Sequence, residues 1–225
     1  MRPCAILAVT AFLLTCLAAV PARAGAWQRA KGAGFAMVSA QVSWPQDLSN
    51  GNGLAPTEDY QTFYLEYGLR PRLTLGLDLG RSVSGGDKTV VFFQVPLRDR
   101  DTGPKVALQM GLGRIDSDDV VRPGLSVGWG RERGWLSIDM LAEMHAGTGR
   151  HDLKLDVTWG RNLAQDRKLI VQMQSGLRHG DPAFARIVPS YVVPLGRRLK
   201  AEIGGSYGLA GDSSMGLKFG LWTEF

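Results

Sequence analysis

The chain closes on Gly216-Leu217-Lys218-Phe219-Gly220-Leu221-Trp222-Thr223-Glu224-Phe225, a stretch in which two kinds of residue alternate. Side chains two apart in a β-strand point to the same face. One face of this stretch is then apolar, with Leu217, Phe219, Leu221, Thr223 and Phe225. The other face is small or charged, with Gly216, Lys218, Gly220, Trp222 and Glu224. The alternation predicts a β-strand that lies between an apolar and a polar environment.

The same alternation recurs through the chain and predicts a single all-β domain over residues 25–225. Helical periodicity is nearly absent from this part, and 29 glycines would be costly in helices. We predict twelve strands, with ten or fourteen as alternatives, over residues 34–44, 60–67, 73–80, 89–97, 105–114, 123–130, 135–146, 152–160, 168–176, 184–195, 199–209 and 215–225. The longest predicted connection, residues 45–59, is rich in Asn, Gly, Asp and Pro.

Two stretches 30 residues apart share one pattern at a predicted turn. Val127-Gly128-Trp129-Gly130-Arg131 and Val157-Thr158-Trp159-Gly160-Arg161 both end an apolar strand on Trp-Gly-Arg. Trp prefers a membrane interface because its ring is apolar and its N–H can bind water. These residues therefore fit an aromatic girdle at the periplasmic rim of a membrane barrel. Packing of both Trp side chains at the end of a soluble sandwich is the alternative.

The apolar stripe that ends on aromatic Phe225 resembles the closing strand of bacterial outer-membrane β-barrels, and the whole pattern is similar to small porin-like members of that class. The resemblance implies a single antiparallel transmembrane β-barrel in the outer membrane, with lipid outside and water inside. It also implies that Phe225 is part of the signal read by the barrel-assembly machinery. The expected partners are outer-membrane lipid, that machinery and small solutes.

The N-terminal residues predict a secretory signal peptide over residues 1–24. Arg2 precedes an apolar run over residues 5–20, and Ala22-Arg23-Ala24 is a small-x-small cleavage site. The run is short for a membrane-spanning helix. A lipoprotein site at Cys16 is the other alternative, although Thr15 precedes it where a small residue is expected.

Cleavage after Ala24 would leave 201 residues without Cys4 or Cys16, the only cysteines. A mature chain of this kind has no disulfide and no thiolate metal site. Its formal charge falls from +5 to +3, and no basic run is interleaved with stacking aromatics. Nucleic acid is therefore not an expected partner.

The densest group of charges on the polar faces spans residues 137–158. We predict that a constriction or binding site in the lumen is formed by Asp139, Glu143, His145, Asp152, Lys154 and Asp156. Mutual neutralisation of these charges inside a partly filled barrel is the competing interpretation.

The pairing of this hairpin is predicted from its charges. If Ala146 pairs with His151, then His145 faces Asp152. Glu143 then faces Lys154, and Asp139 faces Thr158. A shift by two residues would put Glu143 beside Asp156 and His145 beside Lys154, so opposite charges favour the first register.

Taken together, the charges predicted for the lumen give a mixed, slightly acidic lining. The acids are Glu66, Asp78, Asp139, Glu143, Asp152, Asp156, Glu202 and Glu224. The cations are Lys154, Lys168, Arg186, Lys200 and Lys218. Such a lining does not predict strong anion selectivity.

Enzymatic and metal sites are not predicted. Outer-membrane lipid-modifying enzymes often place His and Ser two residues apart, and none of His145, His151 and His179 has that neighbour. Residues 116–119 are acidic but lack the spacing of a calcium loop, so a solvated turn is favoured. No cofactor is expected.

The predicted function is a passive or weakly selective channel for small solutes. The alternative is a non-conducting structural or adhesive barrel whose lumen is closed by Tyr64, Phe92, Leu141 and Trp222. A lipid-modifying enzyme is a less favoured third possibility.

Overall fold

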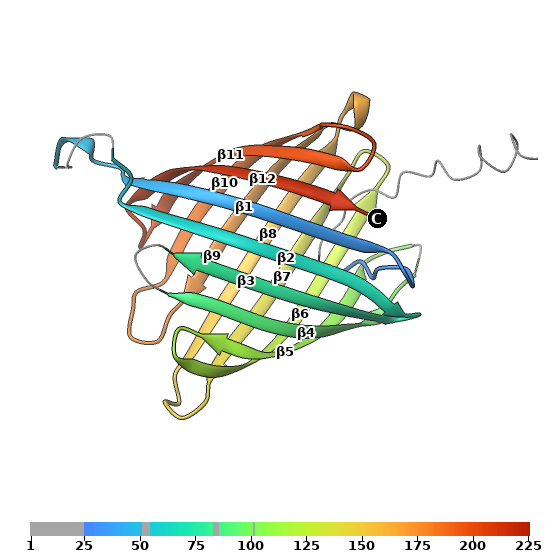
Figure 1. Cartoon of the computed structure of the whole chain (residues 1–225), viewed down its shortest axis with the longest axis horizontal. Helices are drawn as coiled ribbons and strands as arrows, with labels where there is room; N and C mark the ends of the chain where they lie inside the picture. The colour runs from blue at the N-terminus through green and yellow to red at the C-terminus, as the bar shows by residue number, and fades with distance from the viewer. Residues whose placement is uncertain (1–24, 51–54, 83–85, 101) are drawn as a thin grey trace, which may run out of the picture.

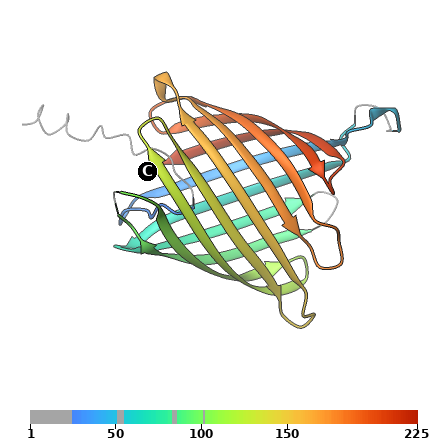
Figure 2. The ribbon, with the colours of Figure 1, turned by 180° about the vertical axis from the view of Figure 1, so that it is seen from behind.

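The computed structural model describes residues 25–50, 55–82, 86–100 and 102–225, so the predicted signal peptide lies outside the described residues. Twelve antiparallel strands form one closed barrel, as predicted. The strands are β1 (Gly34–Pro45), β2 (Glu58–Arg70), β3 (Leu73–Ser82), β4 (Asp87–Arg98), β5 (Lys105–Ile115), β6 (Asp118–Arg131), β7 (Gly134–His145), β8 (His151–Asn162), β9 (Lys168–Leu177), β10 (Phe184–Pro194), β11 (Leu199–Ala210) and β12 (Ser214–Glu224). Figures 1 and 2 show them strongly tilted around the barrel. Two 3₁₀ turns, η1 (Leu48–Asn50) and η2 (Ala164–Asp166), lie between strands, and no helix in these residues is long and apolar enough to cross a membrane.

The barrel closes between its first and last strands. Each strand pairs with its neighbours in sequence, and β1 also pairs with β12, from Phe35 opposite Glu224 to Pro45 opposite Ser214. The backbone of Phe225 continues this ladder, since Gly34 N donates to Phe225 O at 2.6 Å and Phe225 N donates to Gly34 O at 3.0 Å. The Phe225 ring lies against Gly34, where any Cβ would overlap it. No strand is left with an unpaired edge.

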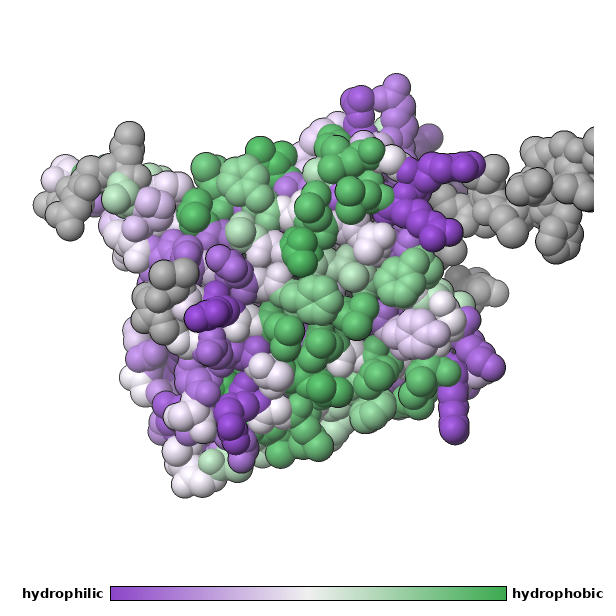
Figure 3. All heavy atoms as spheres, viewed as in Figure 1, coloured by the Kyte–Doolittle hydropathy of each residue, from purple (hydrophilic) through white to green (hydrophobic). Residues whose placement is uncertain are grey.

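The two faces of the wall differ as the alternation predicted. The apolar residues of β12 point outward, and the Phe219 side chain is 48% exposed. Polar residues point inward, and Glu66 on β2 is only 1% exposed. Figure 3 shows an apolar band across the middle of the outer surface, with hydrophilic residues at both ends of the barrel. An apolar outer band around a polar interior is the arrangement expected for a barrel with lipid outside and water inside.

The two ends of the barrel are called here the terminal end, where Gly34 and Phe225 lie, and the loop end opposite it (Figure 1). The longest connection, residues 46–57, lies at the loop end. Trp129 and Trp159 both point outward near the terminal end, where each pairs with Leu136. They occupy the positions predicted for an aromatic girdle.

Three strands begin at least two residues earlier than predicted. β2 begins at Glu58 rather than residue 60, β4 at Asp87 rather than residue 89, and β6 at Asp118 rather than residue 123. Asp118 and Asp119 therefore pair with β5 and are not part of a solvated acidic loop. Only residues 116 and 117 form that turn, in which Asp116 has a φ of 54°. A short side chain that can bond to its own backbone tolerates this left-handed conformation.

Candidate functional site: the lumen of the barrel

Residues 25–33, called here the N-terminal segment, precede β1 at the terminal end. Residues 25–29 lie inside the barrel, whereas residues 30–32 are exposed. Gln94 Nε2 on β4 donates to Gly25 O at 2.8 Å. Arg29 N donates to Thr74 Oγ1 on β3 at 3.2 Å, and Gly32 N donates to Gly68 O on β2 at 2.8 Å. Ala26, Trp27 and Arg29 are buried. The segment therefore crosses the inner faces of several strands before the chain enters β1.

An internal ion pair fixes the middle of this segment. Arg29 Nε lies 2.7 Å from Glu66 Oε2 on β2, and both side chains are buried. Tyr64 OH donates to the other carboxylate oxygen, Glu66 Oε1, at 2.7 Å. The Arg29 guanidinium also lies 4.9 Å from the centre of the Phe35 ring. A buried charge is tolerated when it is paired and hydrogen-bonded in this way.

Large apolar side chains fill the lumen around the N-terminal segment. One buried cluster consists of Ala26, Trp27, Phe35, Trp135, Ile170, Val192 and Trp222. Its members come from the segment and from β1, β7, β9, β10 and β12, so the cluster reaches across the barrel. The Trp27 ring lies against Gly128 on β6, where a Cβ would overlap it. The lumen is therefore narrowest at the terminal end.

Four residues were predicted to close the lumen of a non-conducting barrel. Three of them, Tyr64, Phe92 and Trp222, lie in or beside the apolar cluster. Phe35 packs edge-on against Tyr64 and Trp222, at 6.4 and 6.0 Å between ring centres. Tyr64 stacks on Phe92 at 5.8 Å. Leu141 also has the parity of an inward-facing residue but lies opposite Lys154, in the charged part of the wall.

A charged network occupies the lumen nearer the loop end. Arg122 Nη1 on β6 lies 2.6 Å from Asp78 Oδ2 on β3, and Lys88 Nζ on β4 lies 2.8 Å from Asp78 Oδ1. The same Arg122 atom lies 3.9 Å from Glu143 on β7, which accepts a 2.9 Å hydrogen bond from Lys154 Nζ on β8. Arg122 is only 2% exposed. This network connects five strands from the inside.

His145 takes part in a second group at the rim of the loop end. Its Nδ1 lies 3.1 Å from Asp118 Oδ2, which also accepts from Arg150 Nη2 at 2.7 Å. Its Nε2 lies 3.7 Å from Asp152 Oδ2, a long contact. His145 therefore lies near Asp152, as predicted, but it lies closer to Asp118.

Asp139 and Asp156 lie directly opposite each other on β7 and β8, with inward parity. Ser137 Oγ donates to Asp139 Oδ2 at 2.6 Å. Asp139 Oδ1 is buried and has no hydrogen-bond partner within the described residues. Like charges placed directly opposite each other on a sheet destabilise the pair.

The predicted register of this hairpin is wrong by two residues. Glu143 pairs with Asp152, and Leu141 pairs with Lys154. The alternative register would have paired Glu143 with Asp156, so the observed shift runs in the opposite direction along β8. The predicted contact of Glu143 with Lys154 nevertheless forms, because long side chains reach diagonal neighbours on the same face.

Three lumen cations were missed: Arg29, Lys88 and Arg122. Each forms an ion pair with an acid that the sequence placed in the lumen. They raise the predicted lumen cations from five to eight. The acid Asp118, which shares the inward face of Arg122 and contacts His145, was missed as well, so the acids rise from eight to nine and the lining stays mixed.

Solvent reaches the charged half of the lumen. The inward-facing side chains of Lys154 and Arg186 are 37% and 27% exposed. Arg29 and Glu66 at the terminal end are nearly inaccessible. The lumen therefore forms a vestibule that is open at the loop end and narrows towards the N-terminal segment.

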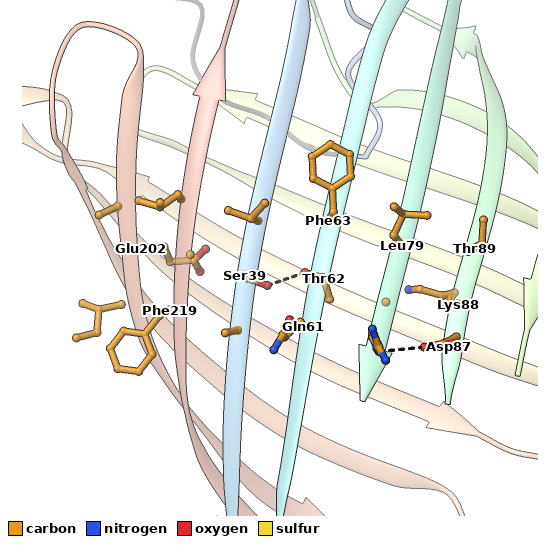
Figure 4. Close-up of a pocket in the computed structure, with 18 of the residues that line it drawn as sticks. Ser39, Gln61, Thr62, Phe63, Leu79, Asp87, Lys88, Thr89, Glu202 and Phe219 are labelled. Atoms are coloured by element: carbon orange, nitrogen blue, oxygen red, sulfur yellow. Dashed lines mark hydrogen bonds and ion pairs between the residues drawn. The ribbon is translucent and has the colours of Figure 1, made fainter. Parts of the chain in front are cut away.

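A hollow of about 920 Å³ lies on the outer wall of the barrel. Two rows of outward-facing residues on β1–β4 and β10–β12 border it, including Val38, Ala40, Phe63, Leu79 and Phe219 (Figure 4). Inward-facing residues between the rows supply its backbone floor, among them Ser39 and Thr62, whose hydroxyls are 2.6 Å apart. A mostly apolar groove on this face would be filled by lipid chains in a membrane.

A closed twelve-stranded barrel with an apolar exterior and an ion-paired lumen is the fold of an outer-membrane porin. The NanC porin is similar to this chain with a TM-score of 0.65 and 9% identity over 84% of this chain and 98% of the porin. The KdgM porin matches with a TM-score of 0.60 and 7% identity over 84% and 99%. The COG4313 outer membrane channel from Pseudomonas putida F1 matches with 0.58 and 12% over 91% and 100%.

These identities establish a shared fold alone. No protein-family model matches the chain, and no curated protein matches it either.

Proposed function

We propose that the mature protein is a narrow outer-membrane channel for small solutes, exported with the help of residues 1–24 as a cleaved signal peptide. The observation that carries this proposal is the solvent-exposed, charged vestibule inside an apolar outer band, with Lys154 and Arg186 reaching into it. Passage of small solutes requires an interior that water can enter. The porin fold of the NanC and KdgM proteins supports the same role.

The lumen charges support weak selectivity rather than a strong preference for anions or cations. Glu66, Asp78 and Glu143 each have a cation within 3 Å. Paired charges leave little net field along a pore, whereas rings of one sign select strongly. The narrow terminal end, bounded by Trp27 and Trp222, would restrict passage to small solutes.

A non-conducting structural or adhesive barrel is the second candidate, and the buried cluster at the terminal end favours it. Planar-bilayer recordings of the purified mature protein separate the two. Stepwise ion currents, with swelling of liposomes in small sugars, would support the channel. A folded, inserted protein that carries no current would favour the structural barrel. The channel proposal assigns no catalytic residue.

Replacing Lys154 by Ala is expected to shift the ion preference of the channel towards cations. Lys154 is the direct partner of Glu143, and its exposed ammonium group faces the vestibule. Its loss leaves an excess negative charge in a confined space, where screening is weaker than in bulk water. Reversal potentials in a salt gradient measure the change. Arg197→Ala, which removes a cation from an exposed turn, is the matched control and should leave the reversal potential unchanged. An equal reversal potential in Lys154→Ala and wild type would exclude this network from the conduction path.

Deleting Phe225 is expected to lower the amount of protein in the outer membrane without blocking export. Phe225 completes the backbone ladder with Gly34, and the resemblance to outer-membrane barrels implies that it is part of the assembly signal. Quantitative blotting of outer-membrane and periplasmic fractions would detect the loss. Phe225→Leu keeps the backbone pairing and removes only the aromatic ring, so it separates recognition from closure. Normal outer-membrane levels of both variants would contradict the assembly role.

A further inference from the structure

The first described residue of the N-terminal segment is pressed against an acid of the lumen wall. A Cβ placed on Gly25 would overlap Asp139 Oδ1 and come within 2.9 Å of Ser137 Oγ. Gly25 also has a φ of +78°, which side chains other than glycine adopt at a cost. Its carbonyl oxygen is fixed by the hydrogen bond from Gln94. The contact with Asp139 therefore leaves no room for a side chain at residue 25, and it applies equally to a chain that begins there.

Asp139 and Asp156 lack the close cation that four other lumen acids have. Glu66, Asp78, Glu143 and Glu202 each form an ion pair of 2.9 Å or less. Within the part of the chain that the structure describes, neither Asp139 nor Asp156 forms an ion pair, although they lie opposite each other. The buried Asp139 Oδ1, the atom that Gly25 approaches, accepts no hydrogen bond from these residues. A cation bound beside Asp139 and Asp156 would stabilise this pair of acids.

We propose that Asp139 and Asp156 form the binding site for the amino terminus of the mature chain. Hydrolysis of the peptide bond between Ala24 and Gly25 adds water across it. The new carboxylate leaves with residues 1–24, and the new amine of Gly25 takes up a proton to become an ammonium group. That group binds Asp139 Oδ1 and supplies one positive charge between the two acids. This inference rests on the cleavage after Ala24 given under the proposed function.

The distances permit this contact without a large movement. The backbone nitrogen is one bond of about 1.5 Å from the Gly25 Cα. The Cα is already adjacent to Asp139 Oδ1, and charged hydrogen bonds form at about 2.7–2.9 Å. An ammonium group has three donors, enough for both carboxylates and a water molecule.

With this site, the binding of the N-terminal segment inside the barrel would depend on cleavage after Ala24. Before cleavage, the nitrogen of Gly25 is an uncharged amide and carries no charge that could compensate either acid. After cleavage, the same atom carries a positive charge, so the segment gains an ionic attachment between Gly25 and Asp139 on the barrel wall. Export and narrowing of the lumen would thus be linked by a single bond cleavage.

The test measures the reactivity of the amino terminus in the full mature protein, purified from outer membranes and folded in detergent. Mass spectrometry first establishes whether the chain begins at Gly25. An amine-acylating reagent is then added at neutral pH, and acylation of the N-terminal peptide is followed over time. Because a charge-assisted bond contributes about 1.5–3 kcal/mol, the amine should react at least about tenfold more slowly in folded than in urea-unfolded protein.

Two variants show whether this protection comes from the acids. Asp139→Asn combined with Asp156→Asn should remove most of the protection, while Glu132→Gln, which neutralises an exposed acid in the turn after β6, should retain it. A chain produced to begin at Ala24 moves the ammonium group by about 3.8 Å and should also lose protection, with both acids intact.

The outcomes are distinct. Protection that persists in the double variant and in the extended chain would overturn the inference, because burial alone would then explain it. A mature chain that begins at another residue would also overturn it, while the bilayer currents of the channel would be unaffected. Loss of protection in both, with Glu132→Gln unchanged, supports the site.

Discussion

Replacing Arg122 by Ala is expected to lower the free energy of unfolding by about 2–3 kcal/mol, whereas Arg114→Ala should cost less than about 1 kcal/mol. Both arginines lie on the β5–β6 hairpin and are paired with an aspartate at 2.6 and 2.9 Å. The two pairs differ in solvent access. Arg122 is 2% exposed, and the Arg114–Asp119 pair is 64% and 70% exposed.

The physical reason is the desolvation of the partners left behind. Without Arg122, Asp78 and Glu143 stay inside the barrel with one lysine each, Lys88 and Lys154. The remaining lysines reduce the loss below the 3–5 kcal/mol typical of a fully broken buried pair. Arg122 also lies 5.9 Å from the Phe92 ring, a contact that alanine cannot replace.

Urea titration in detergent, followed by tryptophan fluorescence and by the mobility shift of the folded barrel on gels, gives both free energies. Equal losses for Arg122→Ala and Arg114→Ala would contradict the structural role assigned to the lumen network. Arg122→Lys is the conservative variant and should recover part of the loss, since it keeps the charge near Asp78.

The fold follows from the sequence because alternation has a period of two. Leu217, Phe219 and Leu221 share a face in any register, so the outer surface was determined without knowledge of strand pairing. The same property explains the error in the β7–β8 hairpin. A shift by two residues keeps every side chain on its face and changes only its neighbours, and charge alone did not choose correctly because Lys154 reaches Glu143 diagonally.

The missed lumen cations have a different cause in each part of the chain. Asp118 and Asp119 were assigned to a loop, so the predicted strand began only at residue 123 and left out Arg122. Arg122 lies two residues before Gly124, and a longer strand would have placed both on the inward face. Lys88 lies one residue before a predicted strand in the same way. Arg29 belongs to a segment with no strand period, so only tertiary structure shows that it enters the lumen.

The N-terminal segment was therefore not predictable from alternation, and it carries the largest functional expectation. Deleting residues 25–31 should raise single-channel conductance several-fold, because Trp27 and Arg29 leave the narrowest part of the lumen. The deletion keeps Gly32 and Gly34, whose backbones bond to Gly68 and Phe225, so β1 retains its pairing. Trp27→Ala is a smaller change that should raise conductance in the same direction while the Arg29–Glu66 pair stays in place.

The measurement that tests the account most directly is planar-bilayer recording of the mature protein beside the variant that lacks residues 25–31. Both proteins must first show the faster gel migration of a folded barrel before boiling. The account predicts small stepwise currents in wild type and currents several-fold larger in the variant. Two folded proteins with equal conductance, or with none, would contradict a channel that the N-terminal segment narrows.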